Sequence, residues 1–139
     1  LHDSAKAASY LKQHIDDEDL RERATHQLEN LNKCYNDLVR DGIVQDEASM
    51  RKLGVMGWDA GRLNFVARAC YCAGYIEEPE LWQLLQRAYD MAHSELHSWR
   101  ELANSYMLGR TLWGGNCDMA GLAEDLLTKP ASPWTRLPW

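Results

Sequence analysis

Hydrophobic side chains recur at spacings of three and four residues along most of the chain, which is the repeat of an amphipathic α-helix. The alternation of apolar and polar positions that would indicate strands is nearly absent. The longest regular stripe is formed by Leu20, Ala24, Leu28, Leu31, Tyr35 and Leu38. The pattern therefore predicts an all-α fold, a compact orthogonal arrangement of five to seven helices around one core.

Caps and helix breakers divide this pattern into segments. The expected helices cover residues 4–15, a stretch from the acidic residues 16–19 to about 40, then 46–53, 58–73, about 80–113 and 118–127. Gly74 suits the left-handed position that ends a helix, and Gly109 is the point where the long helix could break. The spacing of Gly54, Gly57 and Gly61 indicates close helix packing rather than a phosphate-binding loop.

The six tryptophans are unevenly distributed, because all of them lie in residues 58–139. Two of them, Trp134 and Trp139, belong to a closing segment that holds three of the four prolines. Proline argues against a helix there, and exposing two indole rings is unfavourable, so an extended C-terminal tail is expected to clasp back over the domain. Residues 1–139 are expected to form one domain, with an N-terminal helical layer over 1–45 and a core over 46–139.

Charge and cysteine content narrow the classes of function. Fifteen basic and 21 acidic side chains give a net charge of −6, without the cationic surface that nucleic-acid binding needs. No apolar run approaches the ~20 residues that span a bilayer. The four cysteines lack the spacing of a disulfide scaffold or a metal site, and are expected to be reduced packing residues in the cytoplasm. No nucleic acid, membrane, metal or cofactor is therefore expected.

Two arginines, Arg62 and Arg110, fall within stripes of apolar residues when each helix is drawn as a wheel of 100° per residue. An arginine in such a stripe is unusual, because a buried guanidinium without a partner is strongly destabilising. The Arg62 stripe carries Trp58, Phe65, Ala69 and Cys72, with Arg68 at its edge. The Arg110 stripe carries Leu81, Leu85, Ala88, Ala92, Leu96, Trp99, Ala103 and Tyr106, with Trp113 beside it.

These arginines have two interpretations. In the first, Asp59 pairs with Arg62, three residues later, and also serves Arg110 across a helix contact, in an ion-pair network that fixes helix register. In the second, the arginines line an open pocket and hold a carboxylate or phosphate, for which the guanidinium fork is suited. The candidate ligand-binding residues are Trp58, Asp59, Arg62, Arg68, Trp99, Tyr106, Arg110 and Trp113.

Other signals of a site are weak. His93 and His97 stand four residues apart, but the order H-E-x-x-H of zinc proteases is missing, and the wheel indicates a solvated polar face. No serine stands in a nucleophile motif, and no glycine-rich phosphate loop is present. Catalytic residues therefore stay unassigned, and no metal site is expected.

Five sequence blocks follow one another in a characteristic order. They are G-W-D-A-G-R at 57–62, A-G-Y-I at 73–76 followed by Trp82, S-W-R-E at 98–101, S-Y-M-L-G-R at 105–110 followed by Trp113, and S-P-W at 132–134 with the closing L-P-W. Over residues 46–139 this order resembles a bacterial family of uncharacterised proteins, the domain of unknown function 1266. The resemblance implies no particular activity, but it implies relatives that occur near J-domain co-chaperones and in toxin or secretion neighbourhoods.

The missing catalytic set and the acidic composition favour a non-enzymatic protein-interaction module that binds another protein, such as an effector, a toxin or a chaperone. The alternative is an enzyme or ligand-sensing domain that holds a small anion in the Arg/Trp pocket. A first residue other than Met keeps open a third class, a toxin domain from the C-terminus of a longer effector. The first two differ in whether Arg62 and Arg110 meet Asp59 or an open pocket.

Overall fold

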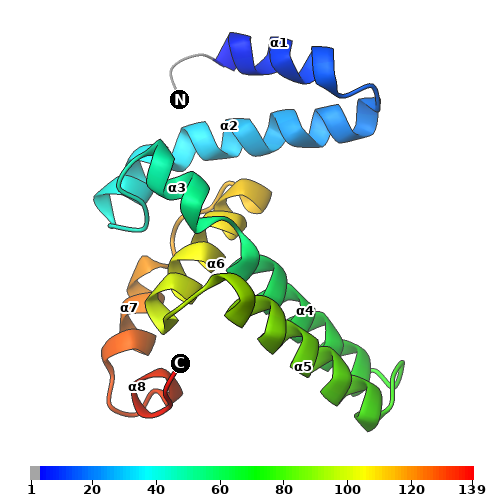
Figure 1. The fold of residues 1–139 in the computed structure, drawn as a ribbon, viewed down its shortest axis with the longest axis vertical. Helices are drawn as coiled ribbons and strands as arrows, with labels where there is room; N and C mark the ends of the chain where they lie inside the picture. Colours follow the sequence, from blue (N-terminus) through cyan, green and yellow to red (C-terminus); the bar gives the residue numbers. More distant parts are fainter. Residues whose placement is uncertain (1–3) are drawn as a thin grey trace.

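The computed structural model describes residues 4–139, except for the side chains at positions 4, 5 and 8, and this part contains helices and no strand (Figure 1). The helices are α1 (Ser4–His14), α2 (Glu18–Arg40), α3 (Glu47–Leu53), α4 (Met56–Cys72), α5 (Glu78–Glu95), α6 (Trp99–Gly114), α7 (Ala120–Thr128) and α8 (Pro133–Arg136). Six of them have nine residues or more, while α3 and α8 are shorter. The predicted all-α fold is confirmed. Within this part, no helix has both the length and the apolar character needed to cross a membrane.

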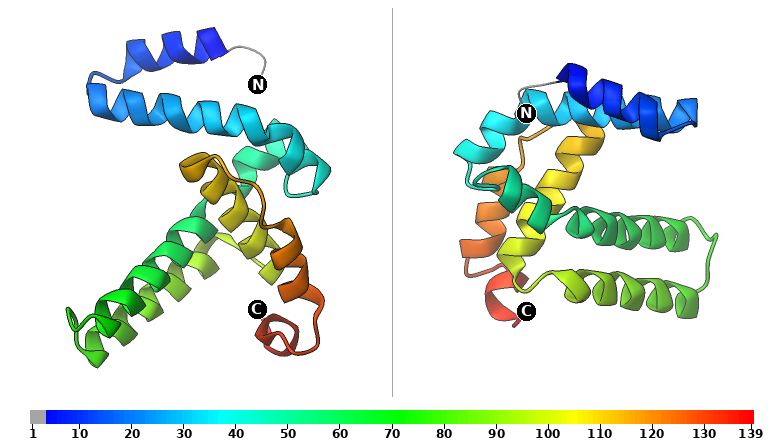
Figure 2. Two further views of the ribbon diagram at one scale, coloured as in Figure 1. Left: turned by 180° about the vertical axis from the view of Figure 1, so that it is seen from behind. Right: turned by 45° about the horizontal axis from the view of Figure 1, so that its top comes forward.

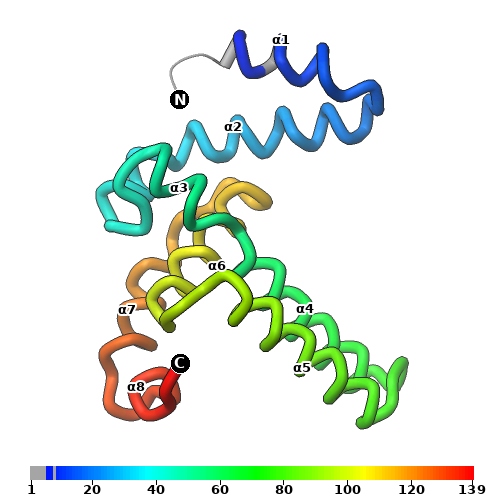
Figure 3. The backbone as a smooth tube through the Cα atoms, viewed as in Figure 1, coloured from blue at the N-terminus to red at the C-terminus, as the bar shows by residue number. Residues whose placement is uncertain are grey.

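Helix α6 lies at the centre of the arrangement, where α2, α3, α4 and α7 pack against it. The antiparallel pair α4 and α5 contacts the rest of the molecule near one end and then extends away as a hairpin (Figures 1 and 2). Helix α1 lies along α2, at the opposite side of the molecule from the tip of the hairpin (Figure 3). The hairpin and the segment formed by α7 and α8 therefore diverge from α6 as two arms.

The main core lies where α2 and the following loop meet α6 and α7. The predicted stripe of α2 supplies Leu31 and Leu38, and Cys34 is buried beside them. The buried core side chains are Leu31, Leu38, Ile43, Val44, Ala103, Met107, Leu108 and Ala123. The predicted stripe therefore identifies the inner face of α2 correctly at Leu31 and Leu38, whereas Leu20 at its start is 47% exposed.

Two glycines allow α4 to approach α6 closely. A Cβ on Gly57 would lie 2.7 Å from a backbone oxygen of α6, and a Cβ on Gly109 would overlap the side chain of Trp58. Ser105, fully buried at this contact, accepts a hydrogen bond from the Gly57 N–H (2.9 Å) and donates to the Gly54 carbonyl (3.0 Å). The close packing predicted from the glycine spacing is confirmed at Gly57, whereas Gly54 ends α3 with a φ of 62°.

Residues 80–113 form two helices rather than one, and the break lies at residues 96–98 instead of near Gly109. The Ser98 hydroxyl caps α6 by accepting a hydrogen bond from the Glu101 N–H at 3.1 Å, while the Glu101 carboxylate accepts one from the His97 N–H at 2.7 Å. Leu96 is extended between the helices. This reciprocal cap starts a new helix although the apolar spacing continues across the break. The wheel drawn across α5 and α6 as one helix is therefore wrong.

The apolar stripe predicted as core on α4 is only partly buried. Trp58 packs inside, but α4 runs on past α6, so the side chain of Phe65 is 72% exposed. Ala69 and Cys72 are exposed as well. Arg62 belongs to this exposed part and is not a core arginine, which removes the desolvation problem that the wheel indicates.

The C-terminal segment returns to α5 and α6, which confirms the predicted clasp. The indole N–H of Trp99 donates to the Leu137 carbonyl at 2.9 Å, and that of Trp139 donates to the Leu96 carbonyl at 3.1 Å. One part of the segment is not extended, because α8 forms a single helical turn. The Ser132 hydroxyl caps this turn, and proline at the first helical position lacks the N–H that a helix start leaves unpaired.

Candidate functional site

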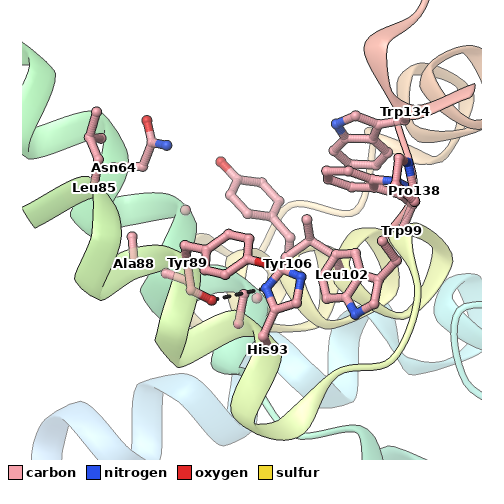
Figure 4. A pocket seen from close by; sticks show the side chains of 15 residues that line it. Asn64, Leu85, Ala88, Tyr89, His93, Trp99, Leu102, Tyr106, Trp134 and Pro138 are labelled. Atoms are coloured by element: carbon pink, nitrogen blue, oxygen red, sulfur yellow. Dashed lines mark hydrogen bonds between the residues drawn. The ribbon is translucent and has the colours of Figure 1, made fainter. Parts of the chain in front are cut away.

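A cavity of about 560 Å³ opens between the α4–α5 hairpin, the first half of α6 and the C-terminal segment (Figure 4). We call it the aromatic cleft. Small residues of α4 and α5 leave its floor open, and these are Gly57, Ala60, Gly61, Ala88 and Ala92. Rings form its walls, and these are Tyr89, His93, Trp99, Tyr106, Trp134 and Trp139. The residues joined in this cleft come from four separate stretches of the sequence.

Five of these rings form a continuous chain of contacts along one wall. Tyr89 and His93 stack with centroids 3.8 Å apart, and His93 stacks in turn on Trp139 at 4.3 Å. Trp139 meets Trp99 edge to face at 5.1 Å, and Trp99 stacks on Trp134 at 5.1 Å. Each contact of this kind is worth about 0.5–1.5 kcal/mol beyond the area it buries. The wall is therefore held in shape without a ligand.

Three nitrogen atoms of the wall lie against backbone carbonyls, and these are Nε1 of Trp99, Nε1 of Trp139 and Nδ1 of His93. His93 Nδ1 lies 3.0 Å from the Tyr89 carbonyl (Figure 4), and a carbonyl oxygen only accepts, so this nitrogen carries the hydrogen. His93 Nε2 is buried and has no hydrogen-bond partner in the described part of the chain. In the neutral ring, Nε2 is then an acceptor that lacks a donor.

The chemistry of the aromatic cleft is that of binding apolar groups. Among the described residues, no aspartate, glutamate, lysine, arginine or cysteine lines it. Its polar side-chain groups are His93, the hydroxyls of Tyr89 and Tyr106, the amide of Asn64 and three indole N–H groups, of which those of Trp99 and Trp139 already donate to backbone carbonyls. Such a surface can hold apolar side chains and orient them by a few hydrogen bonds.

A second cavity, of about 280 Å³, lies where the start of α4 meets α2 and the end of α6. We call it the arginine pocket. The Arg62 guanidinium carbon lies 4.9 Å from the ring centre of Trp113 and 5.6 Å from that of Trp58. Asp59 from α4 and Gln27 from α2 also line this pocket. Cation–π contacts at this distance hold the guanidinium against the two indoles.

The structure thus divides the predicted Arg/Trp pocket between two places. Trp58, Asp59, Arg62 and Trp113 come together in the arginine pocket, whereas Trp99 lies in the aromatic cleft. Tyr106 also lines the cleft, and its ring meets that of Trp58 edge to face at 5.1 Å. The ring contact of these two residues therefore connects the two sites.

The predicted ion-pair network is not formed in the described part of the chain. Asp59 makes no ion pair with Arg62 or Arg110, and Arg62 instead stacks on tryptophan. Arg110 is half-buried in α6, with its Nε buried and unpaired. Arg68 is exposed on the part of α4 that extends past α6. Neither Arg68 nor Arg110 lines either of the two cavities.

The sequence does not predict several residues of the aromatic cleft, among them His93 and Tyr89. His93 is half-buried between two rings rather than on a solvated face, although His97 is exposed as expected. Tyr89 stands four residues before His93, a spacing that brings two rings of one helix together.

Within residues 4–139, no group of three or more histidine, cysteine, aspartate or glutamate side chains lies close enough together to hold a metal ion.

Comparison with known proteins identifies one family that covers nearly the whole chain. A family model described as "Protein of unknown function (DUF1266)" matches residues 2–139. The match extends the resemblance seen over residues 46–139 to the N-terminal residues, which carry no recognisable motif of their own. No curated protein and no solved structure matches the chain.

Proposed function

Because the chain belongs to the DUF1266 family, whose function is unknown, we propose a function from its own geometry: it is a protein-interaction domain whose aromatic cleft binds apolar side chains from one face of a partner helix. The observation that carries the proposal is the cleft itself. Its volume of about 560 Å³ falls in the range of binding sites, and its wall of stacked rings is formed before any ligand arrives.

An apolar track beyond the cleft favours a protein partner over a small molecule. Tyr89 at the cleft and Trp82 lie seven residues apart on one face of α5, and both rings are more than half exposed. From Trp82 to His93 the helix advances about 16 Å. Exposed aromatic surface of this length suits a helical segment that places several apolar side chains in a row.

Acidic residues next to the track indicate which charge the partner helix carries at its corresponding end. Glu77, Glu78 and Glu80 lie exposed at the outer end of the hairpin, where α5 begins. The carboxylate of Glu78 accepts a hydrogen bond from the Trp82 indole at 3.2 Å, which joins the acidic end to the track. A partner helix with basic residues at the corresponding end is therefore favoured, because opposite charge steers association and fixes orientation.

Selection of peptides against the protein tests the proposal. The library consists of displayed helical peptides of about 15 residues, the length at which isolated helices begin to be stable. Asn64→Arg introduces a charge into the cleft lining, while Val66→Arg introduces the same charge about 160° away on the same helix. Both positions are exposed, so α4 tolerates either arginine.

We expect enriched peptides with apolar residues at helical spacing and basic residues towards one end. They bind the wild-type protein and Val66→Arg alike, and bind Asn64→Arg at least about tenfold more weakly, because a desolvated guanidinium opposes binding. Failure of any sequence to be enriched contradicts the proposal. Equal loss of binding in both variants contradicts it as well.

A further inference from the structure

The arginine pocket presents a positive charge, that of the exposed Arg62, which has no ion-pair partner in the described part of the chain. The Arg62 guanidinium carbon lies 5.6 Å from the ring centre of Trp58 and 4.9 Å from that of Trp113, and none of its N–H groups has a hydrogen-bond partner in the described part of the chain. Stacking limits the motion of the side chain and so reduces the entropy lost when it binds a ligand. A carboxylate can therefore be met by two parallel N–H groups of a guanidinium that is already in place.

The pocket also presents an unpaired negative charge close to the positive one. Asp59 lies three residues before Arg62 on α4, so the two side chains emerge on neighbouring positions of one helix face. Its carboxylate makes no ion pair and no hydrogen bond in the described part of the chain. Asp59 and Arg62 therefore lie near each other without forming an ion pair, while the Arg62 guanidinium lies over the two indoles.

The remaining walls are an amide and apolar surface. Gln27 of α2 lines the pocket with an amide that can donate and accept, and Val55 and Leu112 add aliphatic surface to that of the indoles. The volume of about 280 Å³ lies just below the range of about 300–1,000 Å³ that is usual for small-molecule sites. One small ligand with a short apolar portion is therefore what the pocket can hold.

From these features we propose that the arginine pocket binds a free α-amino acid with an aliphatic side chain. The ligand carboxylate pairs with Arg62, its ammonium group pairs with Asp59, and its side chain lies against Val55, Leu112 and Trp113. A simple anion satisfies Arg62 but leaves Asp59 facing like charge, whereas a zwitterion satisfies both. The site is separate from the aromatic cleft and does not depend on the function proposed for it.

Three probes that differ in one charged group each test this assignment on the intact protein. L-leucine carries both charges, 4-methylpentanoate lacks the ammonium group, and 3-methylbutylamine lacks the carboxylate. Binding is followed by the perturbation of backbone amide resonances around Val55 and Leu112 during titration to about 20 mM, which detects weak affinities. We expect saturable shifts with L-leucine and at least about tenfold weaker binding of both other probes.

Variants of the two charged residues complete the test. Arg62→Gln should abolish the response to L-leucine, and Asp59→Asn should weaken it while improving the response to 4-methylpentanoate, because the repelling carboxylate is gone. Arg68→Gln, which removes the same charge from an exposed position outside the pocket, should change nothing. All three positions carry exposed side chains, so folding is retained and is checked by thermal unfolding.

Two outcomes overturn the proposal. One is the absence of any saturable shift with L-leucine. The other is a response to L-leucine that survives Arg62→Gln, or that 4-methylpentanoate matches in the wild-type protein, since either result leaves the paired charges of the pocket without a role in recognition.

Discussion

The indole ring of Trp139 stacks on the imidazole ring of His93, with centroids 4.3 Å apart and planes inclined by 11°. The same indole donates its N–H to the Leu96 carbonyl at the end of α5. The contact joins two positions 46 residues apart (139 minus 93) and makes the tail part of the cleft wall. The aromatic cleft therefore depends on the tail as well as on the hairpin.

Removal of the Trp139 ring should weaken both the fold and the cleft. We expect Trp139→Ala to lower the free energy of unfolding by about 2 kcal/mol, less than a fully buried tryptophan, because the ring is only half-buried. Leu137→Ala is the matched control, since the exposed Leu137 contributes its carbonyl rather than its side chain. Urea unfolding measures both variants, and equal effects would contradict the assigned role of the ring.

The contact between Gly109 and Trp58 should make the helix-favouring residue alanine destabilising. A methyl group on Gly109 would overlap the Trp58 side chain, so Gly109→Ala should destabilise by about 2 kcal/mol or more through overpacking. Gly114, at the end of the same helix, has no atom within 4 Å of an added Cβ, so Gly114→Ala should be neutral or stabilising by up to about 1 kcal/mol. Denaturant unfolding measures the change in the free energy of unfolding for both variants, and the two changes should differ in sign or clearly in size. Similar changes would exclude the close approach of α4 and α6.

The Ser105 hydroxyl should matter far more than an exposed serine. Ser105→Ala leaves the N–H of Gly57 and the carbonyl of Gly54 without their buried partner, and we expect a loss of about 1–3 kcal/mol. Ser94→Ala removes an exposed hydroxyl that donates within α5, and should change stability by less than about 0.5 kcal/mol. Thermal unfolding compares the stability of the two variants. A Ser105→Ala variant as stable as the wild-type protein would contradict the buried hydrogen bonds.

Cys117 should react more slowly than the exposed Cys72 in the native protein. Burial, and then hydrogen bonds with Cys34 and Asp37, raise the pKa of Cys117 to about 12. A raised pKa keeps the thiol protonated at pH 8, so alkylation is slow there and becomes faster as the pH approaches the pKa. Exposed Cys72 serves as the internal comparison in iodoacetamide labelling read by mass spectrometry. Equal rates at pH 8 in the native state would rule out this environment, whereas both should react in denaturant.

The sequence predicts the helical elements well because local signals determine them. The stripe of α2 and the tryptophans of the tail are visible as spacing and composition, and the structure places Leu31, Leu38, Trp134 and Trp139 inward or half-buried as expected. The break before α6 also has a local signal in Ser98 and Glu101, which stand in the S-x-x-E pattern of a helix N-terminus. The apolar spacing continues over residues 80–113, however, and therefore predicts one helix in spite of that pattern.

The site is harder to predict because it is assembled across long separations. A helical wheel assigns Trp58 to the core face correctly, but it also assigns Arg62 there, which is exposed, because it contains no information on where α6 ends its contact with α4. Phe65, one turn further on, is exposed for this reason. The neighbours of His93 come from its own helix and from the tail, and helical spacing alone shows only the first of these.

We propose the aromatic cleft as the surface on which a partner helix binds, and fluorine NMR of the protein labelled with 5-fluorotryptophan is the decisive test of this assignment. The six tryptophans give six resonances, assigned by single Trp→Phe variants, and a peptide selected on the wild-type protein is titrated in. We predict that the resonances of Trp99, Trp134 and Trp139 shift in a saturable manner, with Trp82 following if the peptide reaches the track, while Trp113 stays unchanged. Shifts confined to Trp113 or Trp58, or no shift in the three cleft tryptophans at saturation, would contradict the claim.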